Sequence, residues 1–114
     1  MHKYLRFIDK FGYGEPFVFI HPYKQTLAKA VLDKAFEYIK GIEHIIIFGS
    51  AITDACKPYS DIDICVIGDF DISQISKLRV KDEAMDILHF KNVATLKEDP
   101  RLFEEISKGV AIYA

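Results

Sequence analysis

"IIIFGSAITDACKPYSDIDICVIG", residues 45–68, joins two strand-like runs through an unusual junction. The first run ends in Gly49-Ser50, and after ten further residues the second opens with Asp61 and Asp63. Aspartate is a poor strand former, and two aspartates on one face of a strand repel each other. A sequence that accepts this cost usually gains something from the pair, so we interpret the two carboxylates as functional.

The segments around this stretch predict a compact α/β arrangement in one domain of 114 residues. A helix is expected at 25–40, with one apolar face formed by Leu27, Val31, Leu32, Ala35, Phe36 and Ile39. A strand at 44–48, one or two helical turns after Ser50 and a strand at 61–67 follow. A helix at 71–83 is predicted to turn Ile72, Ile75 and Leu78 inward, and a third strand covers 85–90.

The C-terminal part carries clear helix and strand signals. Asp99 has the character of a helix N-cap, with Pro100 at the first helical position, so a helix is expected to about Lys108. Gly109 then stops this helix, and residues 110–113 are read as a last short strand.

Residues 1–24 form an aromatic-rich N-terminal extension in which "FVFI", residues 17–20, is interpreted as a short strand. Two interpretations of the aromatic residues stay open, a lid on the core and a surface for a partner. We favour the lid.

Composition narrows the function classes. The net charge is −2 and no basic stripe is visible, which disfavours binding of duplex nucleic acid. Cys56 and Cys65 form no CxxC or zinc pattern, and no secretory signal is visible, so reduced thiols in a cytoplasmic protein are expected. No apolar run is long enough to cross a bilayer.

Three carboxylates are candidates for one metal site. Asp61 and Asp63 are two residues apart on a strand and point to the same side, with Cys65 and Ile67 continuing that face into the core. Asp86, near the start of the third strand, is the candidate third carboxylate, and Asp82 is the fallback. Carboxylates that converge repel by several kcal/mol, and Mg²⁺ or Mn²⁺ relieves this repulsion. An ordinary solvated strand end remains the alternative. His89 is expected to be structural, because it alternates to the face opposite Asp86.

Gly49-Ser50 suits the other side of such a cleft. Gly49 has no Cβ and therefore allows a backbone or a phosphate to approach closely, while Ser50 offers a hydroxyl group. The stretch as a whole resembles the GS-x10-DxD signature of nucleotidyltransferases related to DNA polymerase β, and Ser60 and Ile64 also fit that motif. The closing residues 101–114 look like the end of the minimal nucleotidyltransferases. The resemblance covers residue 27 to the C-terminus.

This resemblance implies a nucleotidyltransferase-like α/β (α+β) fold, a small mixed sheet with helices packed on it. It implies that Asp61, Asp63 and Asp86 bind metal and carry catalysis, and that Gly49, Ser50 and Ser60 lie on the nucleotide side. The implied reaction is Mg²⁺-dependent transfer of AMP from ATP to a hydroxyl. Minimal members resemble one half of a pair with a helical HEPN-type toxin, which they modify as antitoxins.

One departure from the family pattern favours an alternative. Relatives often carry a basic residue followed by glycine where this chain has Thr53 and Asp54, and Lys57 is a candidate substitute. A non-catalytic antitoxin that acts by binding alone is therefore the second hypothesis. A nucleotidyltransferase acting on small molecules or RNA ends is the third, disfavoured by the acidic balance and by the lack of an acceptor domain. Self-association is compatible with the aromatic N-terminus.

Overall fold

A mixed sheet forms the centre of the protein, seen here in a computed structural model in which residues 15–113 are described. In these residues the sheet has four strands in the order β3-β2-β1-β4: β1 (Ile42–Phe48), β2 (Ile62–Gly68), β3 (Met85–Phe90) and β4 (Val110–Tyr113). β1 is antiparallel to β2 and β4, whereas β3 runs parallel to β2. The predicted α+β fold with a small mixed sheet is confirmed.

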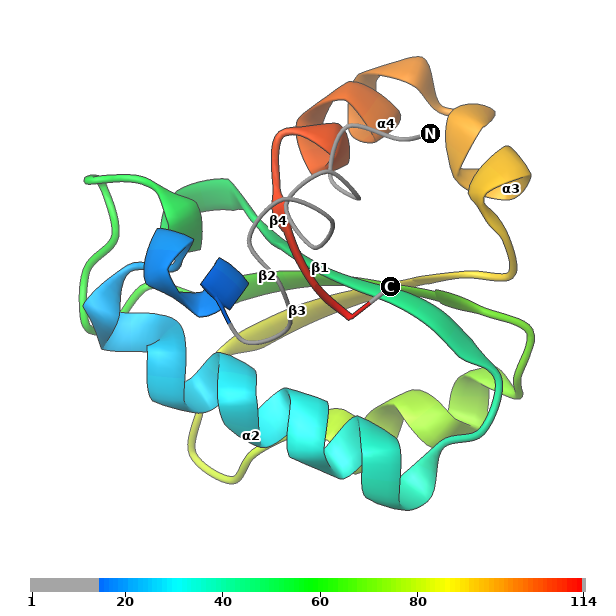
Figure 1. The fold of residues 1–114 in the computed structure, drawn as a ribbon, viewed down its shortest axis with the longest axis horizontal. Coiled ribbons are helices and arrows are strands. Elements are labelled where there is room, and N and C mark those ends of the chain that lie inside the picture. Colours follow the sequence, from blue (N-terminus) through cyan, green and yellow to red (C-terminus); the bar gives the residue numbers. More distant parts are fainter. Residues whose placement is uncertain (1–14, 114) are drawn as a thin grey trace.

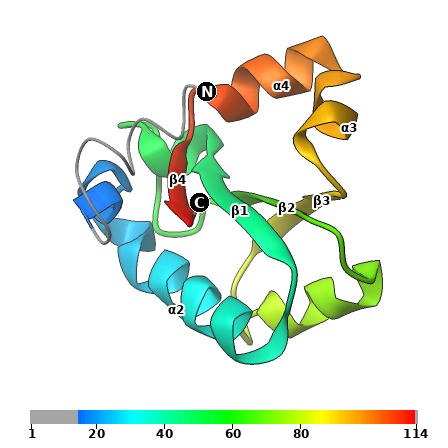
Figure 2. The ribbon, with the colours of Figure 1, turned by 45° about the vertical axis from the view of Figure 1, so that its right-hand side comes forward.

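Helices cover both faces of this sheet (Figures 1 and 2). One face packs against α2 (Pro22–Tyr38) and the 3₁₀ helix η3 (Ile72–Leu78), and the other packs against α3 (Val93–Lys97) and α4 (Pro100–Ser107). Because both faces are covered, the central strands are apolar on both sides, which explains the continuous run of isoleucines in β1.

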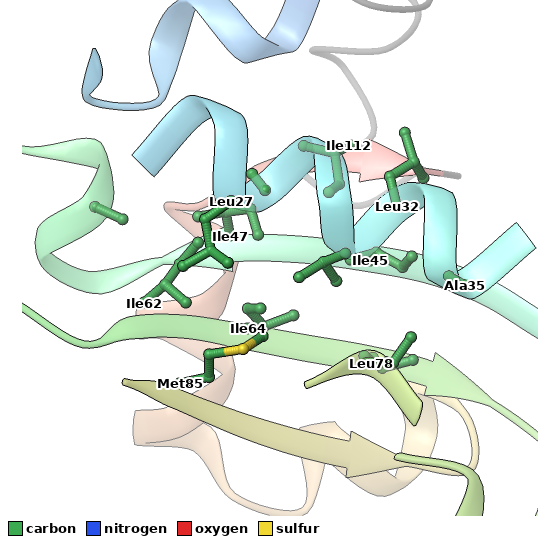
Figure 3. Packing of buried hydrophobic residues seen from close by; sticks show 14 of the residues in the cluster. Leu27, Leu32, Ala35, Ile45, Ile47, Ile62, Ile64, Leu78, Met85 and Ile112 are labelled. Carbon is green, nitrogen blue, oxygen red and sulfur yellow. The ribbon is translucent and has the colours of Figure 1, made fainter. Parts of the chain in front are cut away.

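The residues of β2 alternate between two hydrophobic cores, as the sequence predicts. Ile62, Ile64 and Val66 belong to the larger core beneath α2, which Figure 3 shows from close by. Cys65 and Ile67 belong to the smaller core beneath α3 and α4. Since side chains on a strand alternate between faces, Asp63 lies on the same side as Cys65, toward α3 and α4.

The first part of the described chain differs from the prediction. Residues 17–20 do not form a strand, because Glu15–Phe19 is a 3₁₀ helix, η1. α2 begins at Pro22 and ends at Tyr38, rather than spanning 25–40. The side chain of Phe36 is 57% exposed instead of buried, and it packs edge-on against the ring of Tyr113. The rest of the aromatic segment, residues 1–14, lies outside the described residues.

The predicted helix at 71–83 is also shorter than expected. Asp71 caps η3 by accepting a hydrogen bond from the Ser73 N–H, but the helix ends at Leu78, where Arg79 takes an extended conformation. Leu78 is fully buried, whereas Ile72 is 70% exposed, so its predicted inward position is wrong. Ile72 is the first residue of η3 and lies at an exposed end of the helix, where its neighbours Asp71 and Ser73 are exposed as well.

The third strand and the C-terminal elements match the prediction closely. β3 spans Met85–Phe90, and the side chain of Asp99 caps α4 through the Leu102 N–H at 3.1 Å. The preceding short helix α3 was not predicted; the side chain of Asn92 caps it. A Cβ on Gly109 would lie 2.6 Å from the Ile47 carbonyl oxygen, so glycine lets the end of α4 approach β1 closely.

Candidate functional site

Three strand ends meet at one edge of the sheet. Because β1 is antiparallel to β2, and β3 is parallel to β2, the end of β1 lies beside the beginnings of β2 and β3. Asp63 pairs in register with Phe48 on one side and with Asp86 on the other. Residues directly opposite each other on paired strands point to the same face, so the carboxylates of Asp63 and Asp86 are neighbours. The structure thus brings this predicted pair together.

Gly49 lies directly against the carboxylate of Asp63. A Cβ on Gly49 would lie 3.1 Å from Asp63 Cγ and closer still to Oδ2. Gly49 also has a φ of +73°, in the left-handed region that L-residues rarely adopt. Both observations require glycine here. From this position the chain enters the 3₁₀ helix η2 (Gly49–Ile52), which confirms the predicted helical turn after the first strand.

The electrostatics of Asp63 reflect its acidic neighbours. Partial burial raises the pKa of Asp63 above its ordinary value, and the negative charges of Asp86 and Asp61 raise this pKa further. Glu105 contributes a smaller increase in the same direction. Asp61 itself is exposed and precedes β2 by one residue. The arrangement gathers negative charge around one half-buried carboxylate.

The sequence analysis missed Glu105. This residue lies on α4, which covers the face of the sheet where Asp63 is found. Its negative charge raises the pKa of Asp63, although the two residues belong to different elements and are 42 positions apart in the chain. Only the packing of α4 over the sheet brings the two charges together, so no spacing in the sequence indicates this pair.

The donor set suits a hard divalent cation. Carboxylate oxygens are the ligands that Mg²⁺ and Mn²⁺ prefer, and a bound cation would offset the repulsion felt by Asp63. Across residues 15–113, however, no three His, Cys, Asp or Glu side chains are grouped closely enough to hold a metal ion as they stand. Joint metal ligation by Asp61, Asp63 and Asp86 therefore stays a prediction, although the chemistry of the donors fits.

The hydroxyl groups near the site take part in local turns. The Ser60 hydroxyl accepts a hydrogen bond from the Lys57 N–H at 2.9 Å, one residue before Asp61. The Thr53 hydroxyl donates to the Ser50 carbonyl at 3.0 Å and accepts from the Ala55 N–H. Thr53 is thus occupied with the backbone of the turn, and Asp54 is exposed. Nucleotide contacts by Gly49, Ser50 and Ser60 stay predictions.

Several residues have the structural roles predicted for them. His89 Nε2 lies 2.8 Å from the Gly68 carbonyl oxygen and its ring stacks on Phe70, so the ring is engaged structurally. Cys56 and Cys65 are free and buried. Burial raises the pKa of the Cys65 thiol to about 12, which makes it unreactive at neutral pH.

Pockets lie elsewhere on the domain. One of about 270 Å³ lies between the end of α2 and β1, and its lining includes Phe36, Ile42 and Tyr113. Another of about 200 Å³ lies between the beginning of α2 and η2. Neither pocket is lined by Asp61, Asp63 or Asp86. We base the site on strand register and charge instead of concavity.

Comparison with known proteins places the chain in a family. Residues 30–114 match the family model described as polymerase beta, nucleotidyltransferase. No curated protein matches the chain. Among the described residues, no helix combines the length and apolar character needed to span a membrane. The matched segment includes all four strands and every carboxylate discussed above. Because the match covers most of the chain, this protein belongs to the polymerase β-type nucleotidyltransferase family.

Proposed function

We propose that this protein transfers AMP from ATP to a hydroxyl group, with Mg²⁺ or Mn²⁺ held by Asp61, Asp63 and Asp86. The observation that carries the proposal is the strand register that pairs Asp63 with Asp86 while Gly49 lies against the Asp63 carboxylate. Membership in the family supports nucleotidyl transfer in general. The choice of ATP, of the metal and of the acceptor is our inference.

Each residue then has a distinct part in the reaction. Bound divalent ions would supply charge neutralisation for the attacking and leaving oxygens. Asp61 and Asp63 would hold the triphosphate through these ions, and Asp86 would orient the acceptor hydroxyl and take its proton. The acceptor oxygen forms a bond to the α-phosphorus, and the bond to pyrophosphate breaks.

Serine and glycine residues would contact the nucleotide. Gly49 and Ser50 would approach the β- and γ-phosphates from the other side of the site. The Ser60 hydroxyl accepts its hydrogen bond from the Lys57 N–H and therefore keeps its own hydrogen available for a phosphate oxygen. Lys57 is exposed in the same turn and is our candidate for the missing basic residue.

For the acceptor, we propose a tyrosine hydroxyl on a small helical HEPN-type protein, which this chain would neutralise as an antitoxin. The resemblance to minimal nucleotidyltransferases supports this choice. The test incubates the protein with ATP labelled at the α-phosphate, Mg²⁺ and a candidate acceptor, the product of the neighbouring gene. We expect label in that protein, and loss of labelling when its acceptor tyrosine is replaced by phenylalanine.

Matched substitutions connect the labelling to the site. Asp61→Asn and Asp63→Asn should abolish labelling, whereas Asp69→Asn should retain it, because Asp69 is exposed and follows the opposite end of β2. Absence of label transfer by the wild-type protein with both Mg²⁺ and Mn²⁺ would refute the proposed activity. Label in an added RNA, and not in the protein, would identify RNA ends as the acceptor instead.

A second candidate function is neutralisation by binding alone. It is favoured by Thr53, whose hydroxyl is engaged with the Ser50 carbonyl where relatives often carry a basic residue, and by the exposed negative charge of Asp54. Replacing Asp61 and Asp63 together by alanine separates the two functions. If the variant still neutralises the partner, binding suffices; if it binds the partner without neutralising it, transfer is required.

A further inference from the structure

Lys24 is a buried lysine in an unfavourable place. Its side chain is 3% exposed, although lysine is rarely buried unless it is paired. It also lies in the first turn of α2, where the positive end of the helix dipole disfavours a cation. A residue in such a position needs a compensating contact.

The compensating contact is made with the segment that leads into the aspartates. Lys24 Nζ donates a hydrogen bond to the Pro58 carbonyl oxygen at 3.2 Å, across 34 positions of sequence. Pro58 lies within a turn closed on itself by the Ser60 N–H to the Lys57 carbonyl and by the Lys57 N–H to the Ser60 hydroxyl. Asp61 comes directly after this turn. Lys24 therefore fixes the segment from which β2 begins.

A second bond ties the same end of α2 to the other half of the site. The His21 N–H donates to the Ala51 carbonyl in η2 at 2.7 Å. The beginning of α2 thus contacts both the turn that follows Gly49 and the turn that precedes Asp61, and Figure 1 shows these segments side by side. Two independent hydrogen bonds hold the two halves of the site relative to each other.

We propose that Lys24 is a positioning residue, whose bond to the Pro58 carbonyl sets the position of Asp61 and Asp63 relative to the Gly49-Ser50 turn. This inference rests on the proposed transferase function for its catalytic consequence. The placement of the turn itself does not depend on that function, so the two claims are tested separately.

The first test needs no nucleotide. Lys24→Met removes the donor and keeps a side chain of similar length, while Lys29→Met on the same helix, where the lysine is exposed, is the control. We expect the Ser60 amide to exchange hydrogen about tenfold faster in Lys24→Met, with the amides of β1 unchanged. Unchanged exchange at Ser60 would overturn the inference. So would a uniform acceleration across the sheet, because it would indicate a purely structural role.

The second test measures the labelling reaction. Lys24→Met should lower kcat by about 10–100-fold, because small displacements of catalytic groups have effects of this size. KM for ATP should rise as well, because Asp61 and Asp63 would hold the triphosphate, while the His21–Ala51 bond still holds the Gly49-Ser50 turn. Lys24→Arg should restore much of kcat, and Lys29→Met should match the wild type.

The outcomes of the two tests are distinguishable. An active wild type whose kcat is unchanged by Lys24→Met would overturn the positioning role. A kcat that Lys24→Arg does not restore would also count against the hydrogen bond as its cause. An inactive wild type would refute the proposed function, and the exchange of the Ser60 amide would then decide by itself whether Lys24 holds the turn.

Discussion

Replacing Gly49 by alanine should destabilise the protein and displace Asp63. The φ of +73° at this position costs an L-residue about 1–2 kcal/mol. The new Cβ would also lie 3.1 Å from Asp63 Cγ and closer to Oδ2, so the carboxylate must rotate away at a further cost of about 1 kcal/mol. We therefore expect the free energy of unfolding to fall by about 2–3 kcal/mol.

Urea unfolding of wild type, Gly49→Ala, Asp63→Ala and the double variant measures both contributions. In the Asp63→Ala background only the Cβ of residue 63 remains, at an ordinary contact distance of 3.4 Å. The cost of Gly49→Ala should therefore drop by about 1 kcal/mol in that background, which leaves the backbone strain alone. Ser50→Ala is the neighbouring control and should change stability by less than about 0.5 kcal/mol.

Two results would refute this reasoning. A Gly49→Ala protein as stable as the wild type would mean that the backbone at residue 49 is not held in the left-handed region. An equal cost in both backgrounds would mean that residue 49 does not contact the Asp63 carboxylate. In a thermal scan the expected loss corresponds to a lower Tm by roughly 10–20 °C.

Three further predictions follow from the charges and caps. In metal-free protein, the pKa of Asp63 is higher in the folded state than in the unfolded chain. At a pH between these two values the folded state therefore binds more protons than the unfolded chain. Wild-type stability should therefore fall, relative to Asp63→Asn, as the pH rises from about 4 through the folded pKa; parallel pH profiles would contradict this. Native protein at pH 8 should resist alkylation at Cys65, whose pKa is about 12, and react only after unfolding, which mass spectrometry can check. Asp99→Ala removes the cap of α4 and should lower the free energy of unfolding in urea by about 1 kcal/mol. Glu98→Ala, at an exposed neighbouring residue, is the near-neutral control. Equal effects of the two substitutions would argue against the cap.

Local patterns in the sequence determine the elements around the site. The isoleucine run of β1 requires a strand covered on both faces, and the period-2 alternation of β2 places Asp63 on the side of Cys65. Asp99 and Pro100 mark the start of α4. These signals act between neighbours in the chain, and for this reason they can be read without a structure. Boundaries were less predictable: η3 is a short 3₁₀ helix, and Ile72 is exposed.

Contacts between distant segments were decided only by the tertiary structure. The register of β2 and β3 sets Asp86 beside Asp63, the docking of α4 adds the charge of Glu105, and the burial of Lys24 ties α2 to the Pro58 turn. Each of these depends on how two elements pack, and packing is fixed by the shapes of whole faces rather than by any local spacing. The sequence by itself therefore determined which side chains are candidates for the chemistry, and the fold decided which of them meet.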